Sequence, residues 1–491
     1  MNPLKKLAGE AGLYGLPSIL GRLLNYLLVP LHTGVFFPAQ FGDIAKIYAY
    51  MAFLNIVYTY GMETAYFRFT ARDKLESYYN ITFTAVLGTS LVFSILIYLF
   101  AAEIIWLSQI SVEPYIVQYL AAILFIDAIV AIPLAKLRLA SKAKKFAFTR
   151  MSSIVLNILF NLLFLWFLPL LAENGLVSWT SEKPFDISYV FLANLLANLS
   201  MVIILYKELW QAKLMWSWEK LKPILVYAFP IFLMGMAGIA VEQLDKIIFE
   251  DLLPIGFYED KTAKEALGIY SATFKLSIFM ALAIQAFRYA GEPFFFSRAD
   301  DKDAPELFAK ILYYFVALSL VIWVGVSLNA ELIGKIFLSS PAFREALFLV
   351  PILLLGKLFF GMYVNMSIWF KLTDRTYYGI YISLAGAAVT VIGNVVLVPL
   401  LGYTGSALAG VLAYFVMLVY CYISGQKYFH IPYPMVKIVR NIVFTGIFIA
   451  LYFLLKPTDI WWNYGLGLVL SLTYIGVLFL YERKRIFSDK L

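Results

Sequence analysis

Residues 346–370 read ALFLVPILLLGKLFFGMYVNMSIWF, an apolar run in which Lys357 is the one charged residue. A helix rises about 1.5 Å per residue, so roughly 20 apolar residues cross the ~30 Å hydrocarbon core of a bilayer. Strands of a membrane barrel would be about half as long and would alternate in polarity, which this run does not. The run therefore predicts a transmembrane helix that carries a positive charge near its middle.

The same pattern recurs along the chain. Hydrophobic residues make up 62% of it, charged residues 14%, and its mean hydropathy is +0.81. Soluble domains average roughly 45–50% apolar and about 25% charged residues. We predict an all-α integral membrane protein with 14 transmembrane helices, whose short connections leave no room for a soluble catalytic domain, and hence a protein that is not an enzyme. The expected spans are about 11–35, 44–66, 79–106, 114–137, 149–171, 187–206, 223–249, 266–290, 308–328, 346–370, 377–400, 405–425, 437–455 and 464–481.

Basic residues are distributed unevenly between the two sides. With the N-terminus inside, the even-numbered connections and the tails hold about 27 of the 39 lysines and arginines, and the odd-numbered connections about 6. Basic residues favour cytoplasmic loops, so we predict that both termini are cytoplasmic. The net charge of +8 is scattered over many loops and does not indicate nucleic-acid binding. The single cysteine, Cys421, excludes a disulfide within one chain, and we expect no metal or cofactor.

A faint two-fold repeat organises the chain. The matching signals are Tyr14-Gly-Leu-Pro17 and Tyr227-Ala-Phe-Pro230 at the openings of spans 1 and 7, Gly42 and Gly268 at the starts of spans 2 and 8, and Asn161 and Asn394 ahead of spans 6 and 12. Many transporters are built from repeats, with the substrate site at the repeat interface. We predict an N-terminal lobe at 1–222, a C-terminal lobe at 223–430, and trailing spans 13 and 14 with a tail at 431–491.

Several motifs together resemble one family. They are Gly21-Arg22-Leu-Leu-Asn25, Tyr60-Gly-Met-Glu-Thr-Ala-Tyr-Phe-Arg68, Asp245-Lys-Ile-Ile248, Gly268-Ile-Tyr-Ser271 and Leu401-Gly-Tyr-Thr-Gly-Ser-Ala407. Their order and spacing resemble the bacterial polysaccharide and O-antigen flippases (Wzx-like) of the multidrug/oligosaccharidyl-lipid/polysaccharide exporter superfamily. The resemblance implies two six-helix lobes around a central cavity, alternating access, and a glycan on a polyprenyl diphosphate as cargo. It also implies the bacterial cytoplasmic membrane, a monomer, and a polysaccharide polymerase as a partner.

Four charged residues stand alone near the middle of apolar spans: Arg22, Asp127, Lys275 and Lys357. A charge at the bilayer centre costs roughly 2.5–3.5 kcal/mol, so such residues usually face a bundle interior or a watery cavity. Arg22 and Asn25 share a polar face of span 1, and Arg and Lys both suit phosphate oxygens. We predict that Arg22, Asn25, Lys275 and Lys357 hold the diphosphate; the alternative is an internal ion pair with Asp127.

Asp127 is the expected site for a coupling H⁺ or Na⁺, with a salt bridge to Arg22 as the alternative. Three clusters are candidate gates, and ordinary helix-end charges are the alternative for each. They are Glu242, Asp245 and Lys246 toward the outer side, and Glu63 with Arg68 and Gln285 with Arg288 and Glu292 toward the inner side. Within the outer cluster, the i, i+4 spacing predicts a contact between Glu242 and Lys246.

The leading function is a flippase that moves a lipid-linked oligosaccharide from the cytoplasmic to the outer leaflet, with membrane lipids around it. A cation-coupled multidrug exporter of the same superfamily is the first alternative, and the excess of central cations argues against it. A membrane-embedded glycan ligase or transferase is the second, and the short outer loops argue against that.

Overall fold

The computed structural model describes residues 20–21, 23–73, 77–179, 185–299, 301–457 and 459–486. Within these ranges the regular structure is helical throughout, which confirms the all-α prediction. By contacts, the chain divides into two compact units. Unit 1 comprises Met1–Asp251 and Ile255–Gly268, and unit 2 comprises Leu252–Pro254 and Ile269–Leu491.

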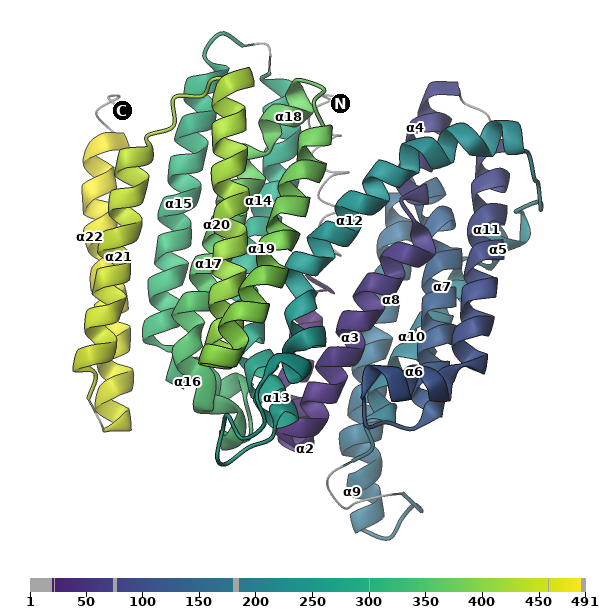
Figure 1. Ribbon diagram of the computed structural model, residues 1–491, viewed down its shortest axis with the longest axis horizontal. Coiled ribbons are helices and arrows are strands. Elements are labelled where there is room, and N and C mark those ends of the chain that lie inside the picture. The colour runs from purple at the N-terminus through teal and green to yellow at the C-terminus, as the bar shows by residue number, and fades with distance from the viewer. Residues whose placement is uncertain are drawn as a thin grey trace. The chain divides into compact units, whose positions relative to one another are not determined.

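Unit 1 contains the described elements from α2 to α11, together with α12 and the start of α13 (Figure 1). They are α2 (Leu28–Val35), α3 (Pro38–Thr59), α4 (Met62–Asp73), α5 (Ser77–Leu99), α6 (Ala101–Ser108), α7 (Pro114–Leu139), α8 (Ala143–Leu162), the π-helical η1 (Leu163–Phe167), α9 (Leu168–Glu173), α10 (Ser188–Ile204), α11 (Tyr206–Trp210), α12 (Trp218–Leu252) and α13 (Ala263–Lys275).

Helix α7 is the centre of unit 1. It packs against α3, α4, α5 and α10, and α8 packs on the far side against α10. One buried cluster joins α4, α5 and α7 to the first turns of α12 through residues such as Met62, Ile81 and Ala228. Because this contact ties α12 to the N-terminal helices, the boundary between the units falls at the end of α12, after Asp251. The predicted lobe boundary at 222/223 falls inside α12, and the division into lobes stays a prediction.

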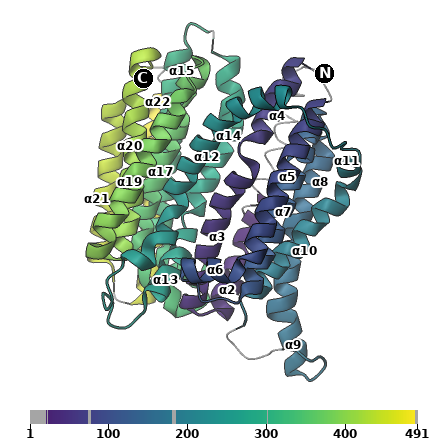
Figure 2. The same ribbon diagram turned by 45° about the vertical axis from the view of Figure 1, so that its right-hand side comes forward.

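Unit 2 is built around α15 and α17. Helix α17 packs against α14, α15 and α20, and α20 packs along α19. Helix α15 also contacts the trailing helices α21 and α22. Figure 2 shows these helices from a second side. Its elements after α13 are α14 (Ile278–Ser297), α15 (Ala304–Leu328), α16 (Ala330–Phe337), the 3₁₀-helical η2 (Pro341–Leu349), α17 (Val350–Met366), α18 (Ile368–Leu372), α19 (Tyr377–Leu401), α20 (Tyr403–Tyr428), α21 (Met435–Leu455) and α22 (Ile460–Ile486).

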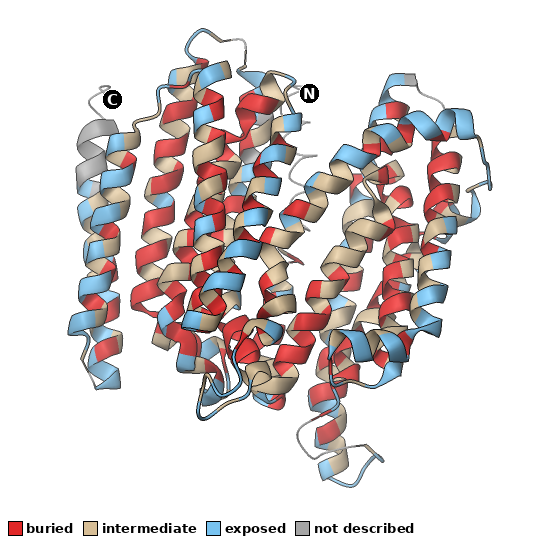
Figure 3. Cartoon of the chain, viewed as in Figure 1, coloured by how far each residue is buried: buried red, intermediate tan, exposed pale blue. Residues whose placement is uncertain are grey.

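Buried residues lie where helices face one another, and large apolar side chains remain exposed on the outer sides of α19, α21 and α22 (Figure 3). Such a surface is expected where lipid replaces water, because lipid tails are as apolar as these side chains. Trp106, Trp210, Trp461 and Trp462 are 73–91% exposed near helix ends. Their positions agree with the aromatic belt that membrane proteins place at the headgroup level.

Ten described helices are long and apolar enough to cross a membrane, or eleven if α13 and α14 form one span. Helices also occupy the described parts of the other predicted spans, but Leu23–Val35 and Ser188–Ile204 are shorter than the test requires. The count of 14 therefore stays a prediction. Helices α13 and α14 meet at an angle of 45°, a break that the apolar pattern of residues 266–290 did not reveal.

The two glycines of the predicted repeat meet within unit 1. A Cβ on Gly268 would lie 1.8 Å from the carbonyl oxygen of Pro38 and 3.1 Å from the amide nitrogen of Gly42, and a Cβ on Gly42 would lie 2.5 Å from the carbonyl oxygen of Lys264. Only residues without a side chain permit this approach of the first turns of α3 and α13. The crossing brings repeat-related positions face to face.

Candidate substrate-binding and coupling site

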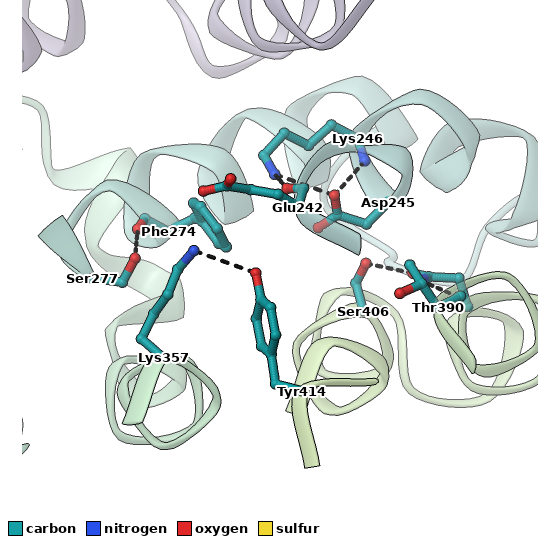
Figure 4. Close-up of polar contacts among 10 residues, drawn as sticks. Glu242, Asp245, Lys246, Phe274, Ser277, Lys357, Thr390, Ser406 and Tyr414 are labelled. Carbon is teal, nitrogen blue, oxygen red and sulfur yellow. Dashed lines mark hydrogen bonds and ion pairs between the residues drawn. The ribbon is translucent and has the colours of Figure 1, made fainter. Parts of the chain in front are cut away.

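Lys357 lies inside α17 and is 4% exposed, as its place in the apolar run predicted. Its ammonium donates a hydrogen bond to the hydroxyl of Tyr414 in α20 at 3.4 Å. The same nitrogen lies 5.1 Å from the ring centroid of Phe274, 5.9 Å from Phe360 and 5.4 Å from Tyr414. Figure 4 shows the Lys357 and Tyr414 side chains pointing toward one another beside the ring of Phe274. Aromatic faces stabilise a buried cation through their ring quadrupoles.

Close packing of α17 fixes this cage. A Cβ on Gly361 would lie 2.6 Å from Phe315 of α15 and 2.9 Å from Ile284 of α14, so α17 approaches both helices at a position without a side chain. Lys357 lies one turn before Gly361 on the same helix face. The aromatic residues of the cage were not part of the predicted site, although aromatic residues make up 18% of the chain.

Lys275 is exposed at the last residue of α13, at the break that separates α13 from α14. It follows Phe274 directly, and Phe274 contacts Lys357. Lys275 and Lys357 thus both belong to unit 2, and their joint role in holding the diphosphate stays a prediction. Ser277 stabilises the break by donating to the Phe274 carbonyl at 2.8 Å.

The N-terminal half of the predicted clamp is only partly described. Arg22 and Pro17 lie outside the described residues, and Asn25 is exposed on the short helical stretch at residues 23–26. The assignment of Arg22 and Asn25 to the diphosphate stays a prediction.

Asp127 is half-buried in α7 and accepts a hydrogen bond from the side-chain amide of Asn198 in α10 at 3.0 Å. Ser153 of α8 donates to the side-chain oxygen of Asn198, also at 3.0 Å. The guanidinium of Arg150, one turn before Ser153, is the positive charge that acts on this carboxylate. The predicted acid thus lies in a polar chain across α7, α10 and α8. Asn198 and Ser153 were not part of the predicted site. Their polarity within apolar spans was the feature of the sequence that could have identified them.

The predicted cluster in α12 is compact. Asp245 and Lys246 are buried, at 7% and 6% exposure, and their side chains lie 3.2 Å apart (Figure 4). The ammonium of Lys246 also donates to the main-chain carbonyl of Glu242 at 3.0 Å. The expected contact between positions 242 and 246 is therefore made through the main chain.

The predicted inner clusters form ion pairs inside each unit. Glu63 pairs with Arg138 of α7 at 2.7 Å, while Arg68 lies with its guanidinium 4.3 Å from the ring centroid of Tyr227. In unit 2, Glu292 pairs with Lys371 of α18 and, at 3.8 Å, with Arg288.

Gln285 lies one turn before Arg288, and its buried side-chain oxygen is without a hydrogen-bond partner in the described part of the chain. The i, i+3 and i, i+4 spacing of Gln285, Arg288 and Glu292 did place the three residues on one helix face.

Sequence reasoning missed a second buried cluster in unit 1. Lys46 is 1% exposed and lies 3.5 Å from Glu250, and Lys264 lies 3.3 Å from Asp43 and donates to Ser111 at 2.7 Å. Asp43 and Lys46 are i, i+3 neighbours beside Gly42, so charges within an otherwise apolar helix were the available signal.

No group of metal-binding side chains occurs among the residues that the structure describes. The two histidines lie apart. His32 contacts the side-chain oxygen of Asn161 at 2.9 Å, and His430 is exposed just after α20.

The model of the family described as polysaccharide biosynthesis protein matches residues 35–346, which is well over half of the chain. The chain belongs to the polysaccharide biosynthesis protein family. This finding confirms the family that the sequence motifs resembled. No curated protein matches the chain.

Solved structures share the fold of this family member at low sequence identity. The lipid II flippase MurJ in an inward closed conformation has a TM-score of 0.71 and 16% identity, over 96% of this chain and 99% of that chain. A mutant of the Vibrio cholerae MATE transporter VcmN has a TM-score of 0.61 and 15% identity, over 86% and 97%. An inward-facing multidrug resistance MATE family transporter of the MOP superfamily has a TM-score of 0.58 and 16% identity, over 87% and 94%. The fold is therefore that of flippases and transporters.

Proposed function

We propose that the protein is a flippase, and not an enzyme, that moves a glycan on a polyprenyl diphosphate from the cytoplasmic to the outer leaflet. It acts by alternating access, as a monomer in a bacterial cytoplasmic membrane with both termini in the cytoplasm. A polysaccharide polymerase is its expected partner. The family match and the MurJ-like fold support the reaction class, and the site supports the class of cargo.

The observation that carries the proposal is the buried ammonium of Lys357. Aromatic rings and one hydroxyl surround it, and the exposed ammonium of Lys275 lies one residue from the ring that it contacts. An ammonium at this place in a membrane-spanning helix marks a candidate substrate pathway, and a negative charge on the cargo would interact favourably with it. A diphosphate carries that charge, and lysine binds phosphate as a point charge.

Coupling to an ion gradient is assigned to Asp127. Its carboxylate is half-buried in a helix that spans the membrane and is held by an uncharged amide. An acid at such a place is a candidate for reversible H⁺ or Na⁺ binding.

The test is transport of a fluorescent undecaprenyl-diphosphate oligosaccharide in proteoliposomes, with binding followed by native mass spectrometry. We expect Lys357→Ala to weaken binding by at least tenfold, with Lys335→Ala, an exposed lysine of α16, as the matched control. Equal binding by both variants would remove Lys357 from the site. Binding of a cationic drug in place of the lipid would favour the multidrug exporter. The MATE-like fold and the carboxylate of Asp127 support this alternative.

A further inference from the structure

An apolar groove lies in unit 1 between α3, α5 and α12, and neither Lys357 nor Asp127 lines it. Its volume is about 640 Å³. Val57 and Tyr60 line it at the end of α3, Thr89 and Phe93 in the middle of α5, and residues between Leu225 and Phe232 in the first half of α12. Its polar groups are few, and two of them, the hydroxyls of Thr89 and Tyr60, bond to each other at 3.3 Å. The walls therefore fit a hydrocarbon chain.

Two backbone features build this groove. Tyr60 and Gly61 both have a positive φ, of 31° and 76°, so the chain turns sharply between α3 and α4. A Cβ on Gly61 would lie 2.7 Å from the carbonyl oxygen of Ala228, so this turn rests directly on α12. Pro230 has no amide hydrogen to donate to the carbonyl of Val226, so the backbone of α12 lacks one helical hydrogen bond in the same region. The groove thus follows from fixed backbone geometry.

Two basic residues lie next to the part of α12 that lines the groove, although neither lines the groove itself. Tyr227 lies between two lining residues of α12, and the guanidinium of the exposed Arg68 lies 4.3 Å from its ring centroid. Lys220, near the start of α12, donates to Ser77 at 3.2 Å. Val226 and Phe229, 67% and 59% exposed, leave the groove open along its side. An open apolar groove with cations beside it complements a long apolar chain with an anionic head.

We propose that this groove seats the isoprenoid chain of the polyprenyl-diphosphate carrier, with its diphosphate at Arg68, as a loading site on the cytoplasmic side. The proposal rests on the function and orientation proposed above. Tyr60, Phe93, Phe229 and Phe232 present rings to a chain whose methyl branches and double bonds pack well on aromatic faces. The volume of the groove accommodates part of such a chain, and the open side lets the remainder stay in the bilayer.

Photo-crosslinking tests the groove directly. The probe is a polyprenyl diphosphate with a diazirine on its chain, incubated with the full chain in nanodiscs, and a phospholipid with the same diazirine on an acyl chain is the comparison. We expect the isoprenoid probe to label peptides that contain residues 89–93 and 225–232, and unlabelled undecaprenyl diphosphate to suppress the labelling. Equal labelling by the phospholipid probe, or no labelling of these peptides, would overturn the proposal.

Matched variants separate the groove from the transport function. Thr89→Trp fills the groove and should reduce labelling and transport at least fivefold, whereas Leu91→Trp, two residues along α5 and 47% exposed, should leave both unchanged. Arg68→Gln should weaken probe binding more than Arg72→Gln. If the wild type transports lipid and Thr89→Trp behaves like Leu91→Trp, the groove proposal fails and the flippase proposal stands. If the wild type is labelled as expected but moves no lipid, the groove proposal stands and the flippase proposal fails.

Discussion

At the scale of single residues, buried charges in this protein come with specific neighbours. Lys46 pairs with Glu250, Lys246 with Asp245, and Lys357 lies among aromatic rings. Removing water from an ion costs several kcal/mol, so each neighbour offsets a penalty that would otherwise destabilise the fold. The first two are ion pairs within one unit, whereas Lys357 is also the cation proposed to bind the cargo.

Glu250→Ala should lower the free energy of unfolding by about 3 kcal/mol, because it leaves the ammonium of Lys46 buried without its acid. The measurement is thermal unfolding of the purified protein by tryptophan fluorescence. Asp301→Ala, which breaks an exposed pair with Arg298, is the control and should cost less than about 1 kcal/mol. The double variant Lys46→Met with Glu250→Leu should recover most of the loss. Similar losses in both single variants would show that the buried pair contributes little.

Asp127→Asn keeps an oxygen that can accept from Asn198 but removes the charge. We expect lipid binding to stay within threefold of wild type, while accumulation driven by an imposed H⁺ or Na⁺ gradient falls about tenfold or more. Asp186→Asn, which changes an exposed carboxylate bonded to Tyr115, is the matched control. Undiminished gradient-driven transport in Asp127→Asn would place ion coupling elsewhere.

At the scale of elements, breaks and crossings matter more than helix lengths. The sequence repeat paired Gly42 with Gly268 and Asn161 with Asn394, and both pairs have matching environments. The glycines meet backbone to backbone, and each asparagine is fully buried and donates to the carbonyl four residues earlier, at 2.8 Å. Repeat-related residues therefore have similar local contacts, and the duplication inferred from sequence stays a prediction.

Gly268→Ala should lower the free energy of unfolding by about 1–3 kcal/mol, because its Cβ would lie 1.8 Å from a main-chain oxygen that cannot move independently. Gly238→Ala in α12 is the control. No atom lies within 4 Å of its Cβ position, so this variant should be neutral or stabilised by up to about 1 kcal/mol. Melting curves of both variants decide the matter. An unchanged Gly268→Ala protein would mean that the crossing is loose in solution.

At the scale of the whole molecule, apolar run length and lone charges were sufficient to predict an all-helical membrane protein and the exceptional position of Lys357. They were insufficient for three features. The break at Leu276–Ser277 contains no proline or glycine from which it could be predicted. The assignment of α12 to unit 1 depends on contacts with α4 and α5. The aromatic cage of Lys357 joins three helices distant in sequence, and no periodicity within one helix reports such a contact.

Orientation is tested with single cysteines. In a Cys421→Ser background, Lys144→Cys lies in a connection predicted to be cytoplasmic, and Glu259→Cys in one predicted to be outside; both positions are exposed. A membrane-impermeant maleimide applied to intact cells should label Glu259→Cys and should label Lys144→Cys only after permeabilisation. The opposite pattern would invert the topology and with it the direction of transport.

The length of α12 has a consequence for the membrane itself. Its 35 residues span roughly 52 Å at 1.5 Å per residue, which is well beyond the ~30 Å hydrocarbon core. The stretch without charged residues, 223–241, is 19 residues and about 28 Å long, which matches that core, so the charged first and last turns extend into the headgroup layers. Anionic headgroups should attract Lys220 and Lys222 at the first of these ends. Lipid composition, and not only substrate supply, should therefore influence the rate at which this protein works.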